Sequence, residues 1–283
     1  MKRIIFDFDN TMGTGHDTDD GLALMYLLGH AEDVEVLGLC CTYGNSDIDT
    51  VYNNTLRIVG ELGLSIPVFK GGANPVEAVS DAARFLAETV AAHPGEISVL
   101  ATGSLTNLKG AAQVDPEFFN NVKEIALMGG ITRSLVINGR IMNELNFSCD
   151  AEASTMVLGA PCPVVDATAH ACLPAVFTKQ LFADRLGADH WLVQECESWF
   201  DWMTKGYAMA AFICWDIVAA ATLVQPELFD FASMQVTLNE RLLRVGYLEA
   251  AADDAPQSTI MIPAIKDVDA FRDACFAAWK KAI

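Results

Sequence analysis

Two patterns of apolar residues alternate along the first part of the chain. Short continuous apolar runs predict strands at residues 3–8, 34–42, 97–101, 122–128 and 163–165, with a further short strand around Val68. Between them, apolar residues recur at helical spacing and predict helices at residues 21–28, 48–62, 82–92, 105–114 and 151–158. Strand-then-helix repetition is typical of an α/β fold with a mostly parallel, Rossmann-like central sheet flanked by helices.

The rest of the chain is less regular. Residues 131–146 read as a long loop, and the later half reads as helix-rich, with an interruption near residues 234–238 and a closing helix over 268–282. The sequence shows no internal repeat, low-complexity tract or Pro/Gly/Ser-rich linker, so we expect residues 1–283 to form a single domain.

One apolar segment needs a separate interpretation. Residues 206–224 (GYAMAAFICWDIVAAATLV) are nearly long enough to span a bilayer. Asp216 lies near the middle of this segment, where a charge would cost about 2.5–3.5 kcal/mol in a membrane. A buried helix that carries one functional aspartate is therefore the preferred interpretation, and we expect no membrane association.

Composition restricts the possible partners. Hydrophobic residues make up 52% of the chain, which suits a compact enzyme. The net charge of −19 argues against nucleic-acid binding, which needs clustered Lys and Arg, and favours a small neutral molecule. The eight cysteines form no CxxC pair, and because residues 3–8 already read as a strand we expect no signal peptide. We therefore expect reduced thiols and a cytoplasmic protein.

Polar groups follow the predicted strands at the edge where α/β proteins bind ligands. These groups are Asp7 and Asp9, the segment Tyr43-Gly44-Asn45, the segment Thr102-Gly103-Ser104, and Met128-Gly129-Gly130. Carboxylates, an amide and hydroxyls are present, whereas Lys and Arg are absent. This set suits a cation and a hydroxyl-rich ligand rather than a phosphate.

Five aspartates near the N-terminus are the most informative feature: Asp7, Asp9, Asp17, Asp19 and Asp20. Two of them could simply complement a helix dipole, but five carboxylates repel one another and call for a cation. IIFDFDNT also matches the hhhDxDxT motif of haloacid-dehalogenase-type phosphatases, with Asp7 as nucleophile. A third interpretation is the strand-plus-DxDxxxDD signature of calcium-dependent nucleoside hydrolases.

The rest of the chain favours the third interpretation. Several segments of the chain resemble, in order, segments of the inosine/uridine-preferring nucleoside hydrolase family. They are IPVFKGG (66–72), VLATGSLTN (99–107), IALMGG (125–130), and ELN (144–146) followed by DAEA (150–153). Trp215-Asp216 falls where that family carries its HD or WD pair. The resemblance covers most of the chain and implies the nucleoside hydrolase fold. The phosphatase interpretation also expects a later Lys and a further acidic pair, and no convincing pair is present.

The spacing of the aspartates departs from the family pattern. Three residues usually separate the second Asp from the DD pair, whereas nine separate Asp9 from Asp19 here. Asp17 could shift the register, because Asp17-Thr-Asp19-Asp20 is itself DxDD. Asp9 is preferred, because a residue at a strand end is held more rigidly than one in a loop.

The resemblance implies hydrolysis of the N-glycosidic bond of ribonucleosides to ribose and free base. It assigns one Ca²⁺ to Asp9, Asp20, Asp216 and the main-chain carbonyl of Leu127, and makes Asp9 the general base. The ribose contacts that it implies involve Asp19 and Asn146 at the 2′-hydroxyl, Asn138 and Glu144 at the 5′-hydroxyl, and Asn45 less specifically.

Two features concern the nucleobase. Trp215 replaces the usual His, which resembles the purine-specific subgroup and implies a purine preference with a stacking role for Trp215. The family's His-containing segment after the third strand is not evident at residues 74–79 (NPVEAV). Homo-oligomers, dimers or tetramers, are common in the family. A non-catalytic nucleoside- or sugar-binding protein remains the alternative to an enzyme.

Overall fold

An eight-stranded sheet forms the centre of the protein. The computed structural model describes residues 1–251 and 257–282. The strand order is β11-β12-β8-β5-β4-β1-β2-β3, and every neighbouring pair is parallel except β11 with β12. The strands are β1 (Lys2–Phe8), β2 (Val34–Cys41), β3 (Val68–Lys70), β4 (Ile97–Ala101), β5 (Glu124–Met128), β8 (Val164–Ala167), β11 (Phe229–Thr237) and β12 (Gln257–Ile265).

Alternating side chains of β1 build the two halves of the core. Phe6 and Phe8 point into the cluster formed with α1 (Asp19–Leu28), α2 (Ile48–Glu61), α12 (Trp215–Val224) and α14 (Val268–Ala282). Ile5 points into the opposite cluster, with α3 (Asp81–Ala92), α4 (Thr106–Val114) and α7 (Ala151–Leu158). This period of two is why β1, buried on both faces, reads as a continuous apolar run.

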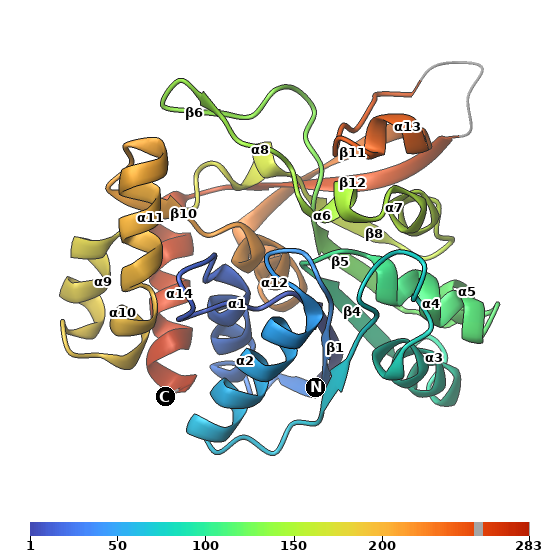
Figure 1. Ribbon diagram of the computed structural model, residues 1–283, viewed down its shortest axis with the longest axis horizontal. Helices are drawn as coiled ribbons and strands as arrows, with labels where there is room; N and C mark the ends of the chain where they lie inside the picture. The colour runs from blue at the N-terminus through green and yellow to red at the C-terminus, as the bar shows by residue number, and fades with distance from the viewer. Residues whose placement is uncertain (252–256, 283) are drawn as a thin grey trace.

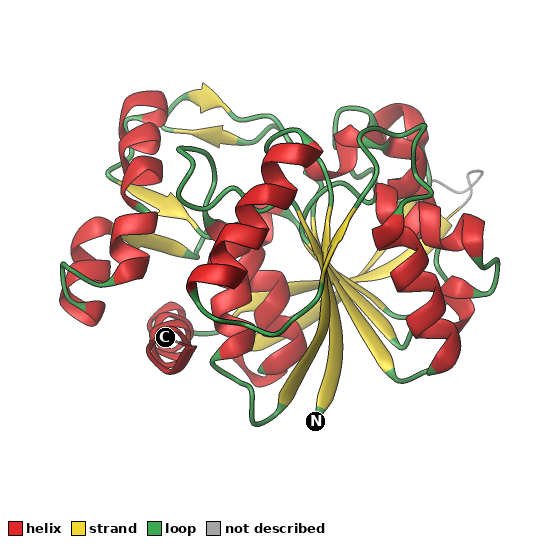
Figure 2. Cartoon of the chain, turned by 60° about the horizontal axis from the view of Figure 1, so that its bottom comes forward, coloured by secondary structure: helices red, strands yellow, loops and turns green. Residues whose placement is uncertain are grey.

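Helices therefore cover both faces of the sheet, as Figures 1 and 2 show. The mostly parallel sheet flanked by helices agrees with the expected fold class. Further short helices are α5 (Phe118–Asn121), α6 (Asn146–Cys149), α8 (Ala169–Cys172), α13 (Glu240–Leu243) and the 3₁₀ turn η1 (Pro226–Leu228).

The second half contains more strand than the sequence predicts. The expected interruption at residues 234–238 is part of β11, a nine-residue strand that pairs antiparallel with the nine residues of β12. Most of β11 between its ends is exposed, so its strand geometry comes from backbone pairing rather than from burial of an apolar face. The break in the helical pattern was therefore expected, but the strand that forms it and the second strand β12 were not predicted.

Smaller elements gather beside α14 (Figure 1). They are the pair β9 (Val176–Thr178) and β10 (Ala211–Ile213), and the helices α9 (Lys179–Leu186), α10 (Trp191–Glu195) and α11 (Glu197–Tyr207). The predicted long loop at 131–146 contains a small hairpin, β6 (Val136–Ile137) with β7 (Arg140–Ile141).

The apolar segment 206–224 is divided between two elements. It supplies strand β10 and then helix α12, whose residues from Trp215 to Leu223 are all buried. Across the described residues, no helix combines the length and hydrophobicity needed to cross a membrane.

Candidate active site

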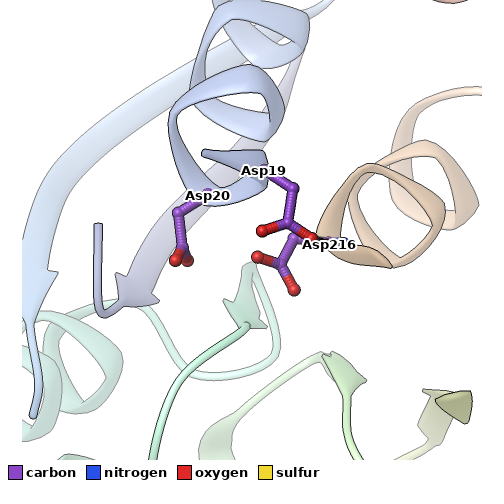
Figure 3. Close-up of side chains that lie close together, drawn as sticks. All are labelled: Asp19, Asp20 and Asp216. Carbon is purple, nitrogen blue, oxygen red and sulfur yellow. Dashed lines mark hydrogen bonds between the residues drawn. The ribbon is translucent and has the colours of Figure 1, made fainter. Parts of the chain in front are cut away.

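Three aspartates meet at the N-terminal ends of two helices. Asp19 and Asp20 begin α1, and Asp216 lies in the first turn of α12. One carboxylate oxygen from each lies within 4.8 Å of the others, and Figure 3 shows the three side chains directed into the same space. Asp19 and Asp216 are 197 positions apart in the sequence, so the site depends on α1 packing against α12.

The environment of this cluster favours a cation. Asp20 and Asp216 are at most 3% exposed. Burial raises the pKa of Asp20 well above its usual value, and Asp9 and Asp19 raise it further. Burial and the neighbouring aspartates do the same to the pKa of Asp216. Among the described residues, Asp20 Oδ2 has no hydrogen-bond partner, although it is buried. An oxygen-ligated metal ion would satisfy this atom and offset the repulsion.

Asp19 also fixes the position of the second helix. Its Oδ2 accepts hydrogen bonds from the backbone N–H groups of Trp215, at 2.7 Å, and Asp216, at 3.1 Å. These N–H groups belong to the first turn of α12 and have no partner within their own helix. Asp19 therefore caps α12 and places Asp216 next to Asp20.

Asp9 lies behind this cluster, at the end of β1. Gly44 and Gly103 press against its carboxylate, and a Cβ on Gly44 would lie 2.1 Å from Asp9 Oδ2. The backbone N–H of Asn45 donates to Asp9 Oδ2 at 2.5 Å, and the Asn45 amide lies 3.3 Å from Oδ1. Burial raises the pKa of Asp9 to about 6, while the hydrogen bond from the Asn45 backbone acts in the opposite direction. Asn45 thus positions Asp9 directly.

A cavity of about 290 Å³ opens above the cluster. The residues expected to bind substrate or metal that line it are Asp19, Asn45, Glu144, Asn146, Trp215 and Asp216. The structure therefore brings most of the expected residues to one cavity.

Glu144 and Asn146 are held in place by the backbone around them. Glu144 accepts hydrogen bonds from the N–H groups of Gly130, Phe147 and Ser148. The Asn146 amide donates to the carbonyl of Thr102 at 2.8 Å and to that of Met128 at 2.9 Å. Asn146 thereby joins the ends of β4 and β5, and its amide oxygen is left for a ligand.

Asn138 and Leu127 do not line the cavity. Asn138 lies at the tip of the β6–β7 hairpin, with a left-handed φ of 48°, and its amide donates to the carbonyls of Tyr207 and Ala208. It is exposed and lies outside the lining of the cavity. Leu127 is a fully buried residue of β5, paired with Ala101 on one side and Asp166 on the other.

The sequence interpretation missed one wall of the cavity. Helix α11 contributes Trp199, Trp202 and Tyr207. Trp199 stacks on Trp202, with ring centroids 4.6 Å apart and an angle of 14° between the planes. The only signal in the sequence is an aromatic-rich helix, and that pattern is also typical of ordinary core packing.

Two further polar residues belong to the site. Thr102, at the end of β4, donates its hydroxyl to Asp20 Oδ1 at 2.6 Å. Asp17 lines the cavity from the loop between β1 and α1. Asp17 lies outside the cluster of Asp19, Asp20 and Asp216, and so does Asp9.

Comparison with known proteins identifies the family. The family model described as inosine-uridine preferring nucleoside hydrolase matches residues 4–273. The chain belongs to this family. Its members hydrolyse the N-glycosidic bond of ribonucleosides, so the protein is a ribonucleoside hydrolase rather than a haloacid-dehalogenase-type phosphatase.

Individual relatives differ in the base that their names specify. The chain is 28% identical over 264 residues to "Probable uridine nucleosidase 2" of Oryza sativa subsp. japonica, which covers 81% of this chain and 76% of the relative. Among solved structures, "Plant nucleoside hydrolase - PpNRh1 enzyme" has a TM-score of 0.84 at 20% identity, covering 98% of both chains. "Purine-Preferring Ribonucleoside Hydrolase from Gardnerella vaginalis" has a TM-score of 0.82 at 23% identity, covering 99% of both. At these identities the structural neighbours show the nucleoside hydrolase fold alone.

Proposed function

We propose that this nucleoside hydrolase uses Ca²⁺ and prefers purine ribonucleosides. The observation that carries the proposal is a buried group of carboxylates at the base of a cavity walled by aromatic rings. The carboxylates suit a hard cation and a pentose, and the aromatic rings suit a planar base.

The donor set fits calcium. Asp20 and Asp216, with Asp9 beside them, supply oxygen ligands only, and Asp20 Oδ2 is a buried acceptor without a partner in the described structure. We assign the ion to Asp9, Asp20, Asp216 and the carbonyl of Leu127, with Asp19 also within reach of it. Bound calcium would supply the positive charge that gathers these carboxylates and orients the hydroxyl groups of ribose.

Asp9 is the proposed general base. A water molecule attacks C1′, and its proton passes to the Asp9 carboxylate, which Asn45 holds in place. The C1′–N bond breaks, and its electron pair leaves with the base. Positive charge that develops on the sugar is stabilised by the surrounding carboxylates.

The ribose contacts follow from the cavity lining. Asp19 and Asn146 are assigned to the 2′-hydroxyl and Glu144 to the 5′-hydroxyl, with Asn45 nearby. A contact between Asn138 and the 5′-hydroxyl would require the β6–β7 hairpin to bring this residue in from the rim. A deoxynucleoside would leave buried groups at the 2′ position unpaired and should be a poor substrate.

The purine preference rests on the aromatic walls. Trp215 lines the cavity from one side, and the stacked pair Trp199 and Trp202 lines it from α11. A purine offers more stacking area than a pyrimidine. The name of the rice relative, a probable uridine nucleosidase, points the other way, so the preference needs a direct test.

Release of reducing sugar from inosine, adenosine, uridine and cytidine tests the proposal. We expect faster turnover of the purine nucleosides, loss of activity with a chelator, and recovery when Ca²⁺ is added. Faster uridine than inosine would reject the preference, and full activity in chelator would reject the metal. Binding of inosine without any turnover would identify a binding protein instead.

A further inference from the structure

The loop between β1 and α1 is long but well fixed. Nine residues separate Asp9 from Asp19, compared with the three that the family pattern leads one to expect. Asn54 of α2 donates its amide to the carbonyl of Asn10 at 3.2 Å and to that of Met12 at 3.1 Å. Asn54 is only 6% exposed, so these bonds are shielded from water.

Arg57, one turn further along α2, adds a second attachment. Its Nη2 donates to the carbonyl of Met12 at 2.9 Å and to Glu195 Oε2 at 2.7 Å. Its Nη1 lies 3.4 Å from Glu195 Oε1, and its Nε donates to Asn54 Oδ1 at 3.1 Å. The guanidinium therefore holds both oxygens of Glu195 and the loop at the same time.

Gly13 shows how closely the loop is packed against this pair. It adopts a left-handed φ of +82°, and a Cβ at this position would lie 2.1 Å from Glu195 Oε2 and 2.8 Å from Arg57 Nη2. Only glycine allows both this backbone conformation and this approach without strain. The fit indicates a built contact rather than a chance surface ion pair.

The Arg57–Glu195 pair joins two walls of the cavity above the acidic cluster. Glu195 is the last residue of α10, and α11, which follows at residue 197, carries Trp199 and Trp202 into the cavity. On the other side, the loop held by Arg57 continues to Asp17, which lines the same cavity. The Thr11 hydroxyl donates to the carbonyl of Asp17 at 2.8 Å and so connects the start of the loop to its end.

We propose that Arg57 is a positioning residue for the nucleobase: through Glu195 and the Met12 carbonyl, it sets the spacing between the aromatic wall of α11 and the Asp17 loop. This inference rests on the proposed function, because the proposed function assigns the side of the cavity formed by α11 to the nucleobase. The residues assigned to the pentose and the metal are Asp19, Asp20 and Asp216, which belong to α1 and α12. The first turns of these two helices are joined by the hydrogen bonds that Asp19 accepts.

This division predicts a selective defect. Removing Arg57 should loosen the base-binding walls and leave the pentose and metal groups in place. Interactions that hold the base equally in the substrate complex and the transition state affect KM rather than kcat. We therefore expect the Arg57→Met variant to raise the KM for inosine by about tenfold while kcat stays within about twofold.

The experiment compares Arg57→Met and Glu195→Gln, singly and together, with Arg185→Met as the matched control. Arg185 forms an ion pair with Asp273 at the same 2.7 Å distance, on elements that do not line the cavity. Affinities for hypoxanthine, uracil, ribose and Ca²⁺ are measured by tryptophan fluorescence and calorimetry, beside inosine kinetics. We expect weaker binding of the base that the wild type prefers, unchanged binding of ribose and Ca²⁺, and a double variant no worse than Arg57→Met.

The outcomes separate this inference from the proposed function. Equal weakening of ribose and base, or no weakening of either, would overturn the positioning role, as would the same effect in Arg185→Met. A wild-type protein that binds hypoxanthine but does not cleave inosine would contradict the hydrolase activity. Even then, a selective loss of base binding in the Arg57 and Glu195 variants would support the positioning role. If Arg57→Met does not fold, Glu195→Gln carries the test, because it keeps the shape of the side chain.

Discussion

The carboxylate of Asp19 caps a helix that begins 196 residues later, through its hydrogen bond from the backbone N–H of Trp215. The bond is 2.7 Å long and buried, and it links the first turn of α1 to the first turn of α12. One carboxylate thus brings together the elements that carry the other members of the acidic cluster. The geometry of the site therefore depends on a bond that stabilises the fold as well.

Substitution of Asp19 separates these two roles. Asp19→Asn removes the charge but keeps an oxygen that can accept the N–H of Trp215, whereas Asp19→Ala removes both. We expect the alanine variant to have a free energy of unfolding about 1 kcal/mol lower than the asparagine variant, as for other N-cap losses. Urea denaturation in chelator measures this difference. Equal stabilities would show that the cap contributes little.

Asp216 should be essential for metal binding. A residue that only hydrogen-bonds to a metal ligand typically contributes about 10–100-fold to metal affinity. Loss of a ligand itself in Asp216→Asn should therefore weaken Ca²⁺ binding by at least about a hundredfold. Asp166→Asn is the matched control, because Asp166 is also fully buried and neither of its oxygens has a partner in the described structure. Isothermal titration of Ca²⁺ should show near-normal affinity in that variant. Equal affinities in both variants would place the ion elsewhere.

The parallel half of the fold was predictable because its strands are buried. β1, β4 and β5 are covered on both faces, and such strands read as continuous apolar runs. β11 was missed because its interior is largely exposed and its pairing partner, β12, lies 20 or more residues later. Backbone pairing across that distance leaves little trace in local hydrophobicity.

The candidate site was predictable to a similar degree. The rule that ligands bind at the carboxyl ends of strands located Asp9, Asn45 and Thr102. In the structure Asn45 donates to Asp9, and Thr102 donates to Asp20. The walls were not predictable. Trp199 reaches the cavity only because α11 folds back over it, and the spacing of aromatic residues on a helix does not distinguish a cavity wall from the core.

The metal-free protein should become less stable as the pH rises through the mildly acidic range. Burial raises the pKa of Asp9 from 3.8 to about 6. Between these values the folded protein binds a proton that the unfolded chain does not, so the free energy of unfolding falls as the pH increases. Burial also raises the pKa of Asp20 and Asp216, so these groups contribute in the same direction.

Calcium should reverse this trend, because it binds the deprotonated carboxylates and stabilises the folded state more as the pH rises. Tm measured at pH 5 and pH 7, in chelator and in Ca²⁺, provides the test. Asp9→Asn should show a smaller fall in Tm in chelator than the wild type. A metal-free Tm that rises from pH 5 to pH 7 would contradict the prediction.

Trp215 should contribute to base recognition. Stacking of an aromatic side chain on a base is worth about 1–3 kcal/mol, so Trp215→Leu should lower kcat/KM for inosine by roughly 10–100-fold. Trp191→Leu is the control, because Trp191 packs at the edge of the core and lies outside the cavity lining. Steady-state kinetics with inosine and uridine measure the effect. A similar loss in both variants would indicate a packing defect instead.

Lys109 should contribute far more to the stability of the fold than a lysine in a surface ion pair. Its ammonium lies 2.8 Å from Asp150, and both side chains are only 2% exposed. Asp150 also caps α7 through the N–H of Ala153 and accepts the hydroxyl of Thr106. Lys109→Met would leave this carboxylate buried without its cation, so we expect the free energy of unfolding to fall by about 3–5 kcal/mol.

Lys179→Met is the control, because its ion pair with Glu197 is exposed and should be worth at most about 1 kcal/mol. Urea denaturation of the two variants gives both values, and a Lys109→Met variant as stable as the control would show that the fold does not depend on this buried ion pair.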